Sequence, residues 1–205
     1  ALDAAPEGST LYFPLSVGSF VFPDSPIAWV WPAPDYPDHC DETVGHSVAI
    51  GDTRTMQQDV GYGIVQMVDI AIRALSPGVN DPNTASDLVA HLGVTMLKIW
   101  ERPIAPTRQE RNGRIVIRRD LDHADYLHAA FDPIRRYGAG DPDVASTVIR
   151  TLATLRSEAI RRELPGPLGP IDQVIEQMAD AVAASDQSQL DKDQVAALVA
   201  GQSSS

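Results

Sequence analysis

The chain has 205 residues, a hydrophobic fraction of 43% and a formal net charge of −12, which fit one ordinary globular core with a small appended module. The negative charge repels phosphate backbones at long range, so nucleic acid is disfavoured as a partner. A single cysteine, Cys40, excludes an intramolecular disulfide and a thiolate-rich metal site.

Residues 10–31 alternate short apolar runs with turn formers, a pattern typical of two or three short strands. Aromatic residues are frequent in these runs, namely Tyr12, Phe20, Phe22, Trp29 and Trp31. So small a β module is unstable alone, and we expect it to pack on the rest of the chain or on a partner. Its aromatic residues suit an oligomeric or membrane-proximal contact; the alternative is that they pack on the helices of the same chain.

Residues 32–53 are rich in proline and acidic residues and are predicted to form a linker. The run from Asp38 to Glu42 contains residue types that bind metals. Adjacent residues of an extended loop point in different directions and rarely converge on one ion, so we predict no metal site there.

Residues 54–164 are predicted to form a helical core domain. Its first helical stretch ends at Pro77-Gly78, and Asp81 then caps a helix that begins at Pro82 and runs to about Trp100. The spacing of apolar residues predicts the buried face of this helix, which comprises Ala85, Leu88, Val89, Leu92, Met96, Ile99 and Trp100.

The rest of the chain is also mainly helical. Asn112-Gly113 predicts a possible β-hairpin near residues 108–118, because this dipeptide readily adopts the left-handed turn that matches strand twist. Helical spacing returns from Leu121 to Tyr137, and Asp141-Pro142 repeats the earlier helix start. Residues 165–200 are predicted to form C-terminal helices and residues 201–205 a disordered tail. The expected fold class is α+β, mainly α, with the small N-terminal β module packed on a multi-helix domain.

A polar stripe in the first helical stretch is the strongest candidate for a functional site. Gln66, Asp69 and Arg73 share one helix face, and the other residues around them are apolar. A helix that is apolar nearly all round is buried, so we expect the stripe to lie inside the protein or at an interface.

Two hypotheses account for this stripe. In the first, an Asp69–Arg73 ion pair braces the turn that leads to Asp81. In the second, Asn80, Asp81 and Thr84 join the stripe in a polar pocket that binds a small ligand or ion. An anion is disfavoured, because Asp81 as helix cap already places negative charge at the free N–H groups.

Catalytic motifs are not found in the sequence. There is no Gly-x-Ser-x-Gly elbow, no phosphate-binding glycine loop and no paired histidine spacing of the kind that binds zinc. We therefore assign no catalytic residue, cofactor or metal, and we lean towards a protein that is not an enzyme.

The stretch from Gln58 to Ala85 reads QDVGYGIVQMVDIAIRALSPGVNDPNTA. It resembles the signature of a bacterial family of predicted membrane proteins, catalogued as domain of unknown function 2254. Two weaker similarities support the resemblance: residues 131–142, which read FDPIRRYGAGDP, and residues 18–21, which read GSFV. Together they cover roughly residues 10 to 160.

The resemblance implies a membrane context, since members of the family are expected to have several transmembrane helices before this region. Here the best apolar run is interrupted by Gln66, Asp69 and Arg73 and falls short of the roughly twenty residues that a span needs. We therefore expect a noncatalytic, soluble extramembrane domain of an uncharacterised integral membrane protein. Its expected role is oligomeric assembly or ligand sensing; the alternative is an enzyme or small-ligand-binding domain with a pocket around Asp69, Arg73, Asn80 and Asp81.

The expected partners follow from this expected role as an extramembrane domain. They are further copies of this chain in a homo-oligomer, and the membrane, reached through a segment absent from this chain. The full-length parent is expected at the cell membrane, with this domain in the aqueous phase on the cytoplasmic side. A standalone homologue without a membrane anchor is the alternative.

Overall fold

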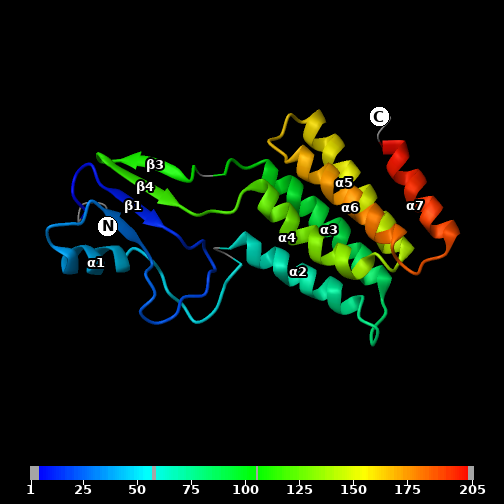
Figure 1. Cartoon of the computed structure of the whole chain (residues 1–205), viewed down its shortest axis with the longest axis horizontal. Helices are drawn as coiled ribbons and strands as arrows, with labels where there is room; N and C mark the ends of the chain where they lie inside the picture. Colours follow the sequence, from blue (N-terminus) through cyan, green and yellow to red (C-terminus); the bar gives the residue numbers. More distant parts are fainter. Residues whose placement is uncertain (1–4, 57–58, 105, 203–205) are drawn as a thin grey trace. The chain divides into compact units, whose positions relative to one another are not determined.

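Residues 5–56, 59–104 and 106–202 are described by the structure, which is a computed structural model. The chain divides into two units: unit 1 comprises Ala1–Asp59 and Ile104–Leu121, and unit 2 comprises Val60–Pro103 and Asp122–Ser205. The described residues form seven helices and a four-stranded sheet (Figure 1). This content confirms the predicted fold class, α+β and mainly α.

Unit 1 is built on a mixed sheet with the strand order β2-β1-β4-β3. The strands are β1 (Thr10–Phe13), β2 (Trp29–Trp31), β3 (Arg108–Arg111) and β4 (Arg114–Arg118). β1 pairs antiparallel with β2 and parallel with β4, and β3 pairs antiparallel with β4. The predicted N-terminal strands are thus present at 10–13 and 29–31, whereas the apolar run from Val17 to Phe22 forms no strand.

The hairpin predicted near residues 108–118 is confirmed. Asn112 and Gly113 both have left-handed backbone angles, with φ of 52° and 67°, as a two-residue hairpin turn requires. The hairpin was assigned to the helical range 54–164, but it completes the sheet that starts with β1. A two-stranded patch buries too little surface on its own, and β4 supplies the neighbour that β1 needs.

The range 32–53, predicted to be a linker, contains helix α1 (Pro37–Gly45). Proline suits the first turn of a helix, and Cys40 and Val44 lie one turn apart on its buried side. These two side chains pack with Leu11 in a small cluster. The prediction missed this helix because a proline- and acid-rich composition hides so short an amphipathic pattern.

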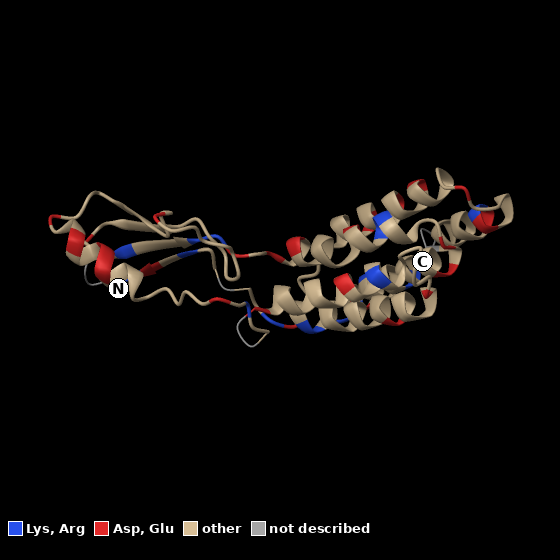
Figure 2. Ribbon diagram, turned by 90° about the horizontal axis from the view of Figure 1, so that it is seen from below, with Lys and Arg blue, Asp and Glu red and all other residues tan. Residues whose placement is uncertain are grey.

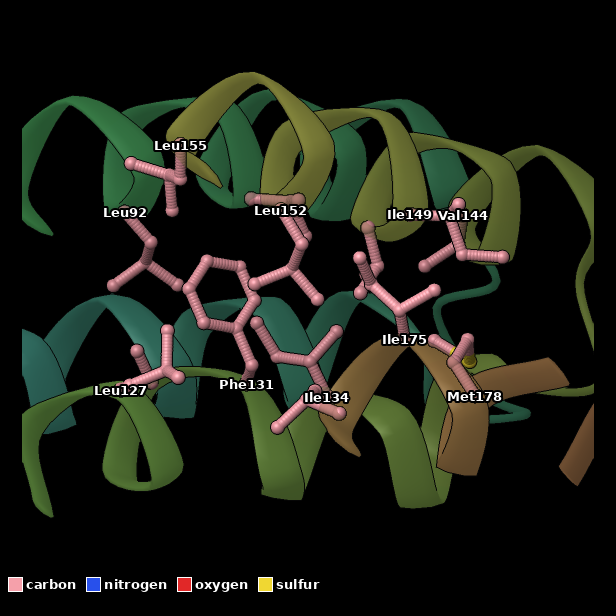
Figure 3. Packing of buried hydrophobic residues seen from close by; sticks show 14 of the residues in the cluster. Leu92, Leu127, Phe131, Ile134, Val144, Ile149, Leu152, Leu155, Ile175 and Met178 are labelled. Atoms are coloured by element: carbon pink, nitrogen blue, oxygen red, sulfur yellow. The ribbon is translucent and has the colours of Figure 1, made fainter. Parts of the chain in front are cut away.

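Unit 2 is a bundle of six helices with one apolar core. They are α2 (Val60–Ala74), α3 (Pro82–Trp100), α4 (His123–Gly138), α5 (Pro142–Arg161), α6 (Leu168–Ala183) and α7 (Gln189–Gln202). Figure 3 shows Phe131 and Ile134 of α4 pointing toward Leu152 of α5, within a cluster that also includes Met178 of α6. The C-terminal helices therefore belong to the same core as α2 to α5.

Local start signals place these helices as predicted. Asp81 accepts a hydrogen bond from the Thr84 N–H and caps α3, and Asp141 accepts hydrogen bonds from two N–H groups at the start of α5. At the chain end, α7 continues through Gly201 and Gln202 of the range predicted to be a disordered tail. Residues 203–205 of that range lie outside the described residues.

Candidate functional site

The polar stripe of α2 lies on the solvent-exposed side of the helix. Gln66, Asp69 and Arg73 are all exposed, so the expectation that they lie inside the protein is wrong, and the alternative that they lie at an interface stays a prediction. The buried side of α2 instead comprises Gly61, Ile64, Val68, Ala71 and Ala74. Helix α2 buries only this side, and the side that carries charge stays in water because its desolvation is costly.

The turn after α2 is held by its backbone rather than by an ion pair. No ion pair joins Asp69 to Arg73 among the described residues, so the bracing hypothesis is wrong. The Ser76 carbonyl accepts hydrogen bonds from the N–H groups of Val79 and Asn80 at 3.0 and 2.9 Å. Asn80 adopts a left-handed conformation with φ of 51°, which asparagine tolerates better than most residues.

Asp81 and Thr84 are the two predicted site residues that the structure brings together. Asp81 Oδ1 accepts a hydrogen bond from the Thr84 N–H at 3.1 Å, and Asp81 Oδ2 accepts one from Thr84 Oγ1 at 2.6 Å. The hydroxyl of Thr84, followed by the backbone N–H groups, lowers the pKa of Asp81. Both carboxylate oxygens thus serve to start α3, and no described hydrogen bond links them to Gln66, Asp69 or Arg73.

Helix α1 and its C-cap His46 carry the run of His, Cys, Asp and Glu residues that the sequence singled out for metal chemistry. Within the described ranges, no group of three or more His, Cys, Asp and Glu side chains could hold a metal ion. His39, Glu42 and His46 line an open depression on this helix. Cys40 lies in the buried cluster, and burial, followed by the charge of Asp41, raises the pKa of its thiol. A neutral, buried thiol is a poor nucleophile.

The sheet of unit 1 presents a surface that the site prediction missed. Tyr12 lies opposite Trp29 and Thr10 opposite Trp31 across β1 and β2, and paired residues point to the same face of a sheet. Tyr12, Trp29 and Trp31 are 41%, 59% and 77% exposed. The sequence signal is the alternation in Trp29-Val30-Trp31, in which Val30 points to the opposite face.

The same exposed face continues across β4 and β3. Ile115 and Ile117 of β4 pair with Thr10 and Tyr12, and Glu110 and Arg108 of β3 pair in turn with Ile115 and Ile117. We call this surface the aromatic sheet face; it comprises Thr10, Tyr12, Trp29, Trp31, Arg108, Glu110, Ile115 and Ile117. The opposite face carries Leu11, which is buried with Cys40 and Val44 of α1. One face of the sheet is therefore covered and the other is open.

Charge is distributed unevenly over unit 1. Strands β3 and β4 contain four arginines and one acidic residue, whereas α1 carries acidic residues. Figure 2 shows the basic residues of the strands in blue and the acidic residues of α1 in red. Two of the four arginines have described hydrogen-bonded or ionic partners: Arg114 donates to the Ala5 carbonyl, and Arg118 pairs with Asp120 at 3.1 Å. Arg108 and Glu110 lie on the aromatic sheet face, and Arg111 lies on the opposite face of the same strand.

A second ionic contact lies beside Gly18, which belongs to the connection from β1 to β2. Arg54 donates two hydrogen bonds to Asp59 Oδ2, at 2.8 Å from Nε and 2.6 Å from Nη2. Gly18, with φ of 82°, lies so close that a Cβ at this position would overlap both side chains. Asp59 belongs to the sequence motif that signals the family resemblance, and here its role is structural; Gln58 of that motif lies outside the described residues.

Within the described ranges, every helix is too short or too polar to span a lipid bilayer.

No solved structure matches the chain. Uncharacterized proteins of Mycobacterium bovis and Mycobacterium tuberculosis are 35% identical to it over 154 residues, which are 70% of this chain and 29% of each relative. The chain thus spans less than a third of the length of these relatives. The sequence profile of DUF2254, described as a predicted membrane protein, matches residues 3–154, and the chain belongs to this family.

Proposed function

We propose that this chain is a noncatalytic extramembrane part of an integral membrane protein and that its role is oligomeric assembly. The membrane part of the proposal comes from the family, whose members are predicted membrane proteins. The proposed location is the aqueous phase on the cytoplasmic side of the cell membrane. The assembly part rests on one observation, the open aromatic sheet face of unit 1.

This face is well suited to a protein contact. With about 200 Å² for each aromatic side chain, the exposed fractions of Tyr12, Trp29 and Trp31 amount to roughly 350 Å² of aromatic surface. A stable interface buries about 800 Å² on each partner, and its centre is enriched in tryptophan, tyrosine and arginine. The two tryptophans would lie at one end of such an interface with Tyr12 beside them, and the isoleucines and charged residues would extend it across the sheet.

The alternative, a small-ligand or enzymatic site around Asp69, Arg73, Asn80 and Asp81, has less support. The first three side chains are exposed to solvent, and the fourth uses its carboxylate to start α3. A ligand site needs polar groups that converge in a concave surface. No described hydrogen bond or ion pair joins any two of these four side chains.

The assembly proposal is tested by light scattering on the purified chain over a wide range of concentrations. We expect the wild-type chain to be an oligomer and the Trp29→Ser/Trp31→Ser variant to be a monomer. Tyr137→Ser is the matched control, because Tyr137 is an exposed aromatic residue of unit 2. A wild-type chain that remains monomeric at high concentration would contradict the proposed role.

The location is tested with the full-length Mycobacterium tuberculosis relative. We expect this protein in the membrane fraction of the cells that produce it. Protease added from the cytoplasmic side of membrane vesicles should release the region that matches this chain. Release only from the opposite side would refute the cytoplasmic location, and a protein found only in the soluble fraction would refute the membrane proposal.

A further inference from the structure

Neither edge of the sheet in unit 1 suits pairing with a further strand. The edge strand β2 has three residues and is followed closely by Pro32 and Pro34, which have no N–H group to donate. The other edge strand, β3, reads RQER and is exposed along its length. Charged side chains on an edge strand oppose pairing with another edge. The aromatic sheet face, rather than an edge, is therefore the surface available to a partner.

The strand register arranges this face in two parallel rows. The first row runs across the sheet as Trp31, Thr10, Ile115 and Glu110. The second row runs in the same strand order as Trp29, Tyr12, Ile117 and Arg108. The two rows carry the same residue at two of the four strands, tryptophan on β2 and isoleucine on β4, and opposite charges on β3.

We propose that a second copy of this chain stacks on the aromatic sheet face, related by a two-fold axis that runs across the strands between the two rows. Such an axis places each row over the other row of the partner. Trp31 then lies over the partner's Trp29, Ile115 over the partner's Ile117, and Glu110 over the partner's Arg108. Aligned stacking of two sheets is a common arrangement, with a spacing of about 10 Å between sheets.

Charge selects this axis over the other two-fold arrangement of the same faces. An axis parallel to the strands would lay β2 over the partner's β3, so that Trp31 would cover the partner's Glu110. A carboxylate buried under an aromatic ring without a positive partner is costly. In the proposed arrangement Arg108 and Glu110 of each copy pair with the partner's Glu110 and Arg108 at the β3 edge of the interface, and the tryptophans meet one another at the β2 edge.

This inference rests on the proposed role in assembly and names the partner and the geometry. It is tested by sedimentation of the full chain with single charge reversals. Arg108→Glu sets an acid over an acid in both charge pairs at the β3 edge, and Glu110→Arg sets a base over a base in both. We expect each variant to dimerise about tenfold more weakly or worse than the wild type. Arg111→Glu is the matched control: it makes the same charge change on the same strand, on the opposite face, and should dimerise like the wild type.

Mixing the two weakened variants gives the decisive measurement. In a heterodimer of Arg108→Glu with Glu110→Arg, every acid lies over a base, so the mixture should dimerise nearly as strongly as the wild type. Instability of either monomer cannot produce such a rescue, because each variant keeps its own substitution in the mixture. The double variant Arg108→Glu/Glu110→Arg should also regain dimerisation.

Each other outcome overturns the inference in a distinct way. A wild-type dimer that neither reversal weakens, or a mixture without rescue, refutes the stacked geometry while the assembly role stands. A monomeric wild-type chain refutes both. A monomeric chain that instead sediments with vesicles of phosphatidylglycerol and phosphatidylcholine, and no longer does so after Trp29→Ser, would show that the face binds a lipid surface.

Discussion

Helices α3 and α5 approach each other closely at Gly93, and this contact predicts the effect of a single methyl group. A Cβ added at Gly93 would lie 2.5 Å from Thr151 Cγ2 and 3.9 Å from Thr151 Cβ. Carbon atoms in contact prefer about 3.5–4.0 Å, so the first contact is an overlap of at least about 1 Å and the second is ordinary. Gly93→Ala itself favours the helix by roughly 0.5–1 kcal/mol, whereas overpacking costs about 1–3 kcal/mol. We expect a net loss of about 1 to 2 kcal/mol in the free energy of unfolding.

Thr151→Ala provides the matched background, because it removes Cγ2 and leaves Cβ. In that background Gly93→Ala should stabilise the chain by roughly 0.5–1 kcal/mol, the helix preference alone. Urea denaturation of the four variants measures the coupling between the two positions, expected at about 2 kcal/mol. The reasoning is refuted if Gly93→Ala has the same effect in both backgrounds, or if it stabilises the wild-type chain.

Two further predictions concern pH and backbone conformation. The hydrogen bond from Arg161 is the main reason that the pKa of Glu158 falls from 4.5 to about 2. The contribution of the ionised Glu158 carboxylate to stability is therefore present above pH 4.5 and lost as the pH falls towards 2. The difference in melting temperature between the wild type and Glu158→Gln should shrink over that range. A difference that stays constant would contradict this reasoning. Gly18→Ala should cost roughly 1–2 kcal/mol for its left-handed conformation alone, and more for the overlap with Asp59. In chemical denaturation Gly78→Ala, whose added Cβ meets nothing within 4 Å, is the control, and equal effects of the two would contradict the argument.

The parts of the fold that follow from neighbouring residues were predicted correctly. Asp81 and Asp141 cap helices because their carboxylates reach N–H groups two or three residues ahead. Asn112-Gly113 forms the hairpin because both residues accept left-handed angles. Each of these features depends on local chemistry within a few residues, so the sequence displays it directly.

The parts that depend on distant segments were missed. The sequence shows that β1 needs a neighbour but not that β4 is that neighbour. It also shows that α2 is apolar on most sides, while the choice of its buried side depends on how the other helices pack. For that reason Gln66, Asp69 and Arg73 were predicted to lie inside the protein or at an interface, and in the single chain they are exposed.

In the candidate site, too, the local features were predicted and the features that depend on distant segments were missed. Asp81 was correctly predicted to cap a helix, and its contact with Thr84, which was expected only as part of a ligand pocket, accounts for both carboxylate oxygens. The aromatic sheet face could be anticipated only in part. Its tryptophans are visible in the sequence, but the rows that join them to Ile115 and Ile117 depend on the pairing of β1 with β4.

The pairing of β1 with β4 also affects when the sheet can form during synthesis of the chain. The chain leaves unit 1 after Asp59, returns to it at Ile104 and leaves it again after Leu121. During synthesis β1 emerges about a hundred residues before its parallel neighbour, and such distant pairings form slowly. Helices α2 and α3 are translated before β4, so until then the β1–β2 pair lacks its parallel neighbour. Neither unit is one uninterrupted segment, so a nascent chain released before β4 would hold an incomplete sheet.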